Sequence, residues 1–348
     1  MQPGDEGRAA VALRSALDAV GYGQMYGGML EAAHSLGPFA RDAAAARGFA
    51  ASIEGGAVLA LLAMGDPVAG IAIPVALAAA LAELAAVGLA ERAAAGEWRT
   101  AGWVVVPHGD GRLLTDVPRH YGGQAVRVYV GPDSLLLAAS LPQQPGLRVL
   151  DLGAGCGIQG LLAVRAPAAV TLLDIEPRAV RFCAFNAVLN GVQERTLCLE
   201  GDLYAPVPGE RFDLIVSLPP YLPVPNGLSV SSIAGGGPDG LGVIRQVMAG
   251  AADHLTPSGR LVFLCQTLGD GTGPFLARTP QPPGVRWSME LRAGFPAEML
   301  ALNMAKELPA REPGLDPATV LERYRESFAT LGATQLFTVL VSGVAPAG

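Results

Sequence analysis

The sequence has almost no lysine, no clustered cysteines and no long uninterrupted hydrophobic run. Lys306 is the only lysine, so nearly all of the 24 basic residues are arginines, which is typical of high-GC codon bias. The 31 acidic residues bring the formal net charge to −7. Nucleic-acid binders need clustered cations to displace counterions, so this balance argues against a nucleic-acid partner.

The four cysteines show neither Cys-x-x-Cys spacing nor a cluster with histidine, so we expect no metal site and no disulfide framework. Reduced, buried thiols in a cytoplasmic protein are the simplest expectation. The opening residues MQPGDEGRAA are polar and acidic, so no signal peptide is expected. Between residues 57 and 90, glycine, proline and Glu83 interrupt the apolar run before it reaches the roughly 20 residues of a bilayer span, so no membrane partner is expected.

Residues 1–124 are predicted to form a helical cap that ends in a β-hairpin. Apolar residues recur at helical spacing at Leu13, Leu17 and Val20 and again within 75–87. The segments GWVVVP and RLLTDV then flank His108-Gly109-Asp110-Gly111, a turn signal between two short strands. This order of elements resembles a winged helix. Segment 75–87 offers only one polar side chain to a base edge, so we expect a lid, a substrate-side cap or a dimerisation surface.

Residues 125–348 alternate between strand and helix patterns and should form the second domain. The strand candidates are 147–152, 169–175, 195–202, 212–218, 259–266 and 334–344. The alternation predicts an α/β, Rossmann-like fold with a mainly parallel, doubly wound sheet that binds its ligand at the carboxyl ends of the strands. A helical region at 297–331 precedes the last strand, and Asp316-Pro317 supplies a helix N-cap and first turn within it.

A glycine-rich turn follows the first strand of this domain. In VLDLGAGCGIQG, residues Asp151, Gly153, Ala154 and Gly155 lie between an apolar strand and a helix, where small residues let the backbone approach a ligand closely. Rossmann-like nucleotide binders in general share this turn. It therefore predicts a cofactor site without naming the cofactor.

The ends of the next two strands predict an adenosine. Asp174, in LLDIEP, can accept both hydroxyls of a ribose, and Ile175 follows it. Asp202, in EGDLY, can accept the exocyclic amine of adenine, with Leu203 beside the ring. The segment FDLIVSLPPYLP then closes the predicted pocket after the fourth strand.

Four motifs in this order resemble those of class I S-adenosylmethionine-dependent methyltransferases. FDLIVSLPPYL followed by GGGPDGLG is similar to the branch that contains the protein-glutamine methyltransferases of release factors, which carry Asn-Pro-Pro-Tyr. In VYVGPDSLLLA, which contains Ser134, the chain resembles the segment that touches the methionine end of the cofactor in that branch. The resemblance covers roughly 125–345. It implies a seven-stranded methyltransferase fold with S-adenosyl-L-methionine as cofactor.

The chain departs from that branch at Leu218, where the family has Asn. In the family the Asn side chain and an adjacent carbonyl accept hydrogen bonds from the substrate NH2, and a Leu side chain cannot. We therefore expect neither a protein glutamine nor a nucleobase as acceptor. Tyr221 is expected to orient the sulfonium, with Ser217 and the Leu218 carbonyl holding the nucleophile. Tyr204 is a further catalytic candidate that could equally be a packing residue.

These residues leave three functions open. The first expectation is methylation of a nitrogen or oxygen on a small molecule. The alternative is a cyclase resembling the azetidine-2-carboxylate synthases, in which S-adenosylmethionine is the only substrate and its own amine expels methylthioadenosine. The third is a cofactor-binding regulator without catalysis. The oligomeric state stays open.

Overall fold

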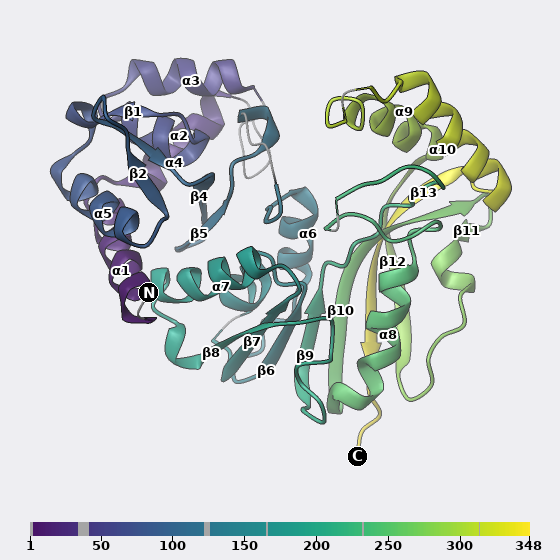
Figure 1. Ribbon diagram of the computed structural model, residues 1–348. Coiled ribbons are helices and arrows are strands. Elements are labelled where there is room, and N and C mark those ends of the chain that lie inside the picture. Colours follow the sequence, from purple (N-terminus) through teal and green to yellow (C-terminus); the bar gives the residue numbers. More distant parts are fainter. Residues whose placement is uncertain (1–2, 34–41, 122–125, 165, 232, 313) are drawn as a thin grey trace. The chain divides into compact units, whose positions relative to one another are not determined.

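The computed structural model describes residues 3–33, 42–121, 126–164, 166–231, 233–312 and 314–348 (Figure 1). The chain forms two compact units, the first made of residues 1–145 and 154–200 and the second of residues 146–153 and 201–348. Neither unit has a boundary at residue 124, so the division into a cap and a cofactor domain stays a prediction. None of the helices in these described ranges combines the length and the apolar composition that a membrane span requires.

The first unit begins with helices that bury their apolar sides against one another. They are α1 (Pro3–Ala19), α2 (Tyr22–Ala32), α3 (Ala43–Ser52), α4 (Gly56–Met64) and α5 (Val75–Ala86). Helix α4 has the sequence GAVLALLAM, which is apolar on all sides, and such a helix is stable only when it is surrounded. Accordingly Val58, Leu59, Leu61 and Leu62 are all fully buried. The 3₁₀ turn η1 (Gly70–Ala72) precedes α5.

Two small antiparallel sheets complete this helical region. Strands β1 (Val68–Ala69), β2 (Ala90–Arg92) and β3 (Glu97–Thr100) pair in the order β1-β3-β2, and the sequence pattern did not reveal them. Strands β4 (Trp103–His108) and β5 (Gly111–Asp116) form the predicted hairpin around Gly109-Asp110. A second 3₁₀ turn, η2 (Arg119–Tyr121), follows.

The remainder of the first unit carries part of the Rossmann-like pattern. Its elements are α6 (Pro132–Ser140), the π-helix η3 (Ile158–Ala163), β7 (Ala169–Asp174), α7 (Pro177–Leu189), η4 (Gln193–Arg195) and β8 (Thr196–Glu200). Strands β7 and β8 run parallel. The buried Asn186 of α7 accepts from the Leu114 backbone N–H at 2.8 Å and donates to the Cys156 carbonyl at 2.9 Å. One side chain therefore joins the hairpin to the glycine-rich turn.

The second unit is built on a sheet with the order β12-β13-β10-β9-β6. Its strands are β6 (Arg148–Leu152), β9 (Phe212–Ser217), β10 (Leu255–Asp270), β12 (Arg286–Pro296) and β13 (Gln335–Val344), with β11 (Gly273–Pro274) beside β10. Strands β6, β9 and β10 are parallel neighbours, whereas β13 runs antiparallel to β10 and β12. The remaining elements are α8 (Gly242–His254), η5 (Phe275–Arg278), α9 (Ala297–Glu307) and α10 (Pro317–Leu331).

Helices α9 and α10 are inserted between two antiparallel strands, β12 and β13, and lie side by side (Figure 1). The Asp316 side chain caps α10 by accepting from the Thr319 backbone N–H at 2.9 Å, and Pro317 occupies the first helical position, as the sequence predicted. The protein is thus of the α/β class, with a Rossmann-like fold and a helical N-terminal region. This fold class confirms the sequence prediction.

Candidate active site

Gly155, in the glycine-rich turn, and Asp174, at the end of β7, meet in the first unit. Gly155 has a φ of 57°, and a Cβ built there would touch nothing within 4 Å. Glycine is therefore favoured at this position because the backbone is left-handed, and not because space is lacking. The Gly155 N–H donates to Oδ2 of Asp174 at 2.8 Å, and the Glu176 N–H donates to Oδ1 at 2.9 Å. Two backbone donors thus fix the plane of the carboxylate.

The electrostatics of Asp174 suit a ligand-binding carboxylate. Burial raises the pKa of this carboxyl, and the hydrogen bonds from Glu176 and Gly155 offset only part of that rise. A carboxylate has about four lone-pair positions, so it can accept hydrogen bonds beyond those from Gly155 and Glu176. These positions fit the two hydroxyls of a ribose. The next residue, Ile175, is 60% exposed, so its side chain is open to a ligand.

Ser134 lies in the first turn of α6 and is 4% exposed. Its Oγ accepts from the Gly131 N–H at 3.2 Å, and its carbonyl accepts from Nε2 of Gln159 at 3.2 Å. Gln159 belongs to the π-helix η3, a type of turn often found at functional sites. Gln159 was not predicted from the sequence, where its only signal is a polar amide directly after the glycine-rich turn.

In the second unit, the ends of β6 and β9 carry the predicted catalytic segment. Asp151 and Ser217 are both nearly fully buried, at 2% and 1% exposed. The Ser217 hydroxyl donates to the Leu152 carbonyl at 2.8 Å, so it joins the two strands. The β9 pairing ends at Ser217, which leaves Leu218 as the first residue beyond the ladder. Leu218 and Tyr221 are half-buried.

The turn after Glu200 holds the predicted adenine-side residues. Asp202 is exposed, and Leu203 has a φ of 45°, an uncommon backbone conformation for a residue with a branched side chain. The Tyr204 hydroxyl donates to the Val247 carbonyl at 2.8 Å, and its ring stacks on His254 with centroids 4.6 Å apart. Burial raises the pKa of Tyr204. These contacts favour the packing role that the sequence left open for Tyr204.

A family model and several curated relatives show which kind of domain contains these motifs. Residues 128–270 match the family model "Methyltransferase small domain". These residues carry a methyltransferase domain, and the chain is an S-adenosylmethionine-dependent transferase. The matched residues include the glycine-rich turn, Asp174 and the Pro-Pro-Tyr segment. The cofactor expected from the sequence is therefore confirmed.

Three curated relatives share this methyltransferase domain. The chain is 37% identical over 158 residues to a ribosomal protein uL3 glutamine methyltransferase of Bradyrhizobium diazoefficiens, covering 42% of this chain and 49% of that protein. It is 35% identical to a release factor glutamine methyltransferase of Gloeobacter violaceus, covering 34% and 45%. A release factor glutamine methyltransferase of Deinococcus radiodurans is 36% identical, with 42% and 53% covered. The chain spans about half the length of these relatives.

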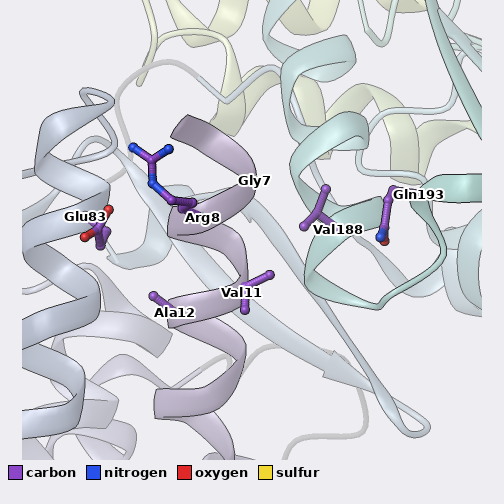
Figure 2. A pocket seen from close by; sticks show the side chains of 7 residues that line it. All are labelled: Gly7, Arg8, Val11, Ala12, Glu83, Val188 and Gln193. Atoms are coloured by element: carbon purple, nitrogen blue, oxygen red, sulfur yellow. The ribbon is translucent and has the colours of Figure 1, made fainter. Parts of the chain in front are cut away.

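A hollow of about 560 Å³ lies away from the methyltransferase motifs, on the first unit (Figure 2). Its lining residues are Gly7, Arg8, Val11, Ala12, Glu83, Val188 and Gln193. The side chains come from α1, α5 and the α7 region, and none belongs to the predicted site. The lining is mainly apolar and offers no group suited to methyl transfer.

Proposed function

We propose that the protein transfers a methyl group from S-adenosylmethionine to the side-chain amide nitrogen of a glutamine in a protein. The observation that carries this proposal is the Pro219-Pro220-Tyr221 segment directly after β9. The three relatives described above, which share this domain, are all named as glutamine methyltransferases of a ribosomal protein or a release factor. The substrate class is therefore a ribosomal protein or a release factor.

This proposal corrects the acceptor expected from the sequence. The predictions of a small-molecule substrate, and of S-adenosylmethionine as the sole substrate, are wrong, because the relatives are named for the glutamine of uL3 and of release factors. The Leu218 side chain does not by itself exclude an amide substrate. An amide N–H can also be held by a backbone carbonyl, and a side-chain substitution leaves that group in place.

The residues after β9 supply such an acceptor. The Leu218 carbonyl follows the last paired residue of β9, and prolines at the next two positions restrict the backbone there. In the proposed reaction this carbonyl accepts one N–H of the glutamine amide. The ring of Tyr221 would lie beside the sulfonium, because the face of an aromatic ring favours a cation.

Positioning and exclusion of water should dominate this transfer. The cofactor supplies a methyl group already activated by the positive sulfur. In this transfer the amide nitrogen would bond to the methyl carbon as the carbon–sulfur bond breaks, the electron pair of that bond would stay on sulfur, and one amide proton would pass to solvent. Asp174 accepts the ribose hydroxyls, which holds the cofactor during the displacement.

Mass spectrometry of intact and digested substrates tests the proposal. The purified protein is incubated with S-adenosylmethionine and either a release factor or ribosomal protein uL3 from a bacterium. We expect one added methyl group on a glutamine, and its loss when that glutamine is replaced by alanine. Methylation at any other residue type, or of neither protein, would overturn the proposed acceptor.

A further inference from the structure

Helix α10 holds the loop that follows the Pro-Pro-Tyr motif. We define the acceptor loop as residues 221–229. The hydroxyl of Tyr324, on α10, donates to the Pro223 carbonyl at 3.1 Å, and the Tyr324 side chain is fully buried. One position earlier on α10, Nη1 of Arg323 donates to the Gly227 carbonyl at 2.6 Å. Two adjacent helical residues thus bind two carbonyls of this loop.

Apolar contacts reinforce these hydrogen bonds. Leu222 and Leu228 pack against a buried cluster formed mainly by α9 and α10, which includes Tyr324 and Phe328. The Tyr324 and Phe328 rings meet edge to face with centroids 5.7 Å apart. Since Tyr324 is enclosed on its apolar sides, its hydroxyl has a defined direction toward the loop.

A glycine-rich segment holds the same loop by backbone groups. The Leu222 N–H donates to the Ala234 carbonyl at 2.8 Å, and the Gly236 N–H donates to the Leu222 carbonyl at 2.8 Å. A Cβ at Gly240 would lie 2.4 Å from the Tyr221 carbonyl oxygen, so glycine is required at this close approach. The acceptor loop is therefore bound by backbone of residues 234–240 and by side chains of α10.

We propose that Tyr324 is a positioning residue for methyl transfer, which acts together with Arg323 by setting the place of the acceptor loop and of Tyr221. Helices α9 and α10 lie outside the matched methyltransferase residues 128–270, so this support comes from the inserted helical pair. The effect on catalysis rests on the proposed function. The effect on loop order does not depend on the acceptor.

The experiment compares Tyr324→Phe with Phe328→Leu as a packing control from the same cluster. Hydrogen exchange is followed in peptides that cover residues 222–229, because the Leu222 and Val224 amides are hydrogen-bonded there. We expect Tyr324→Phe to speed exchange of these amides about tenfold, as the loss of one buried hydrogen bond implies. The kcat of this variant with the substrate protein should fall by a similar factor, and its affinity for S-adenosylhomocysteine should be unchanged.

The control should behave differently in the same assays. Phe328→Leu should lower Tm but leave loop exchange and kcat near the parent values, because it keeps the hydrogen bond to Pro223. If Tyr324→Phe does not fold, Arg323→Gln takes its place. The hydrogen bond from Arg323 to the Gly227 carbonyl holds the same loop but is exposed, so its loss should not prevent folding. Parent-like exchange in the folded variant overturns the positioning role. If Tyr324→Phe speeds exchange but the parent protein methylates no glutamine, the proposed function is wrong and the positioning of the loop by Tyr324 still holds.

Discussion

Replacing Asp174 by Asn should weaken cofactor binding by at least about tenfold. The two carboxylate oxygens accept the Gly155 N–H at 2.8 Å and the Glu176 N–H at 2.9 Å. An Asn side chain must turn its NH2 toward one of these backbone donors, and that NH2 cannot accept from a ribose hydroxyl. The variant therefore loses one ligand hydrogen bond and one loop hydrogen bond. The loop bond is lost from the free and the bound protein alike, so only the ligand bond lowers the affinity, by about 1.5 kcal/mol or more, the low end for a bond to a charged group.

Calorimetry with S-adenosylhomocysteine measures this loss directly. Asp213→Asn is the matched control, because Asp213 also accepts a backbone N–H, from Arg148 at 2.9 Å, but lies at the start of β9 and away from the predicted site. We expect the control to bind within about twofold of the parent protein. Thermal unfolding of both variants establishes that they are folded. Parent-like affinity in Asp174→Asn would refute the assignment of this carboxylate to the ribose.

Further outcomes follow from the same contacts. Leu218→Asn should raise kcat/KM for a glutamine substrate severalfold, since it adds an amide acceptor worth about 1 kcal/mol; an unchanged or lower value would argue against an amide substrate. Tyr221→Ala should lower kcat at least about tenfold while S-adenosylhomocysteine affinity stays within a fewfold, and turnover at the parent rate would remove Tyr221 from the site. Tyr204→Phe loses the bond to the Val247 carbonyl, so we expect unfolding to become easier by about 1 kcal/mol with kcat retained; a selective loss of kcat would restore its catalytic role. Cofactor affinity should fall as pH drops through the raised pKa of Asp174, because the ionised form accepts the hydroxyls, and Asp174→Asn should flatten this profile.

The pH dependence of stability has the opposite sign to that of cofactor affinity. Burial raises the pKa of Asp174 in the folded, cofactor-free protein, so folding favours its protonated form. The stabilising contribution of Asp174 is therefore complete below its unfolded pKa and is lost as pH rises through its folded pKa. Unfolding measured against pH in the parent and in Asp174→Asn separates this term from cofactor binding.

Where a short apolar run ends at a glycine or a proline, the amino-acid pattern located the elements well. The candidates 147–152 and 212–218 correspond to β6 (Arg148–Leu152) and β9 (Phe212–Ser217). Buried parallel strands read as continuous β-branched and aliphatic segments, so they stand out from their polar neighbours. The start of α10 was equally predictable, because the cap at Asp316 depends on residues three positions apart.

Strands that depend on distant partners were not found in advance. Strands β1 to β3 have two to four residues, too few to show a period, and they exist because they pair with one another. Strand β12 contains a bulge between Leu291 and Ala293 that breaks its alternation of side chains. It pairs with β13, from which helices α9 and α10 separate it in the sequence.

The sequence by itself determined the α/β class, the cofactor and the places of the glycine-rich turn, Asp174 and Tyr221. These features depend on neighbouring residues, whose spacing sets local backbone shape and the ends of strands. Only the tertiary structure decided that Asp174 is fixed by the N–H groups of Gly155 and Glu176, and that the acceptor loop rests on Tyr324. Tyr324 and Pro223 are 101 residues apart in the chain, and no local pattern can encode a contact that exists only once helices and strands have packed.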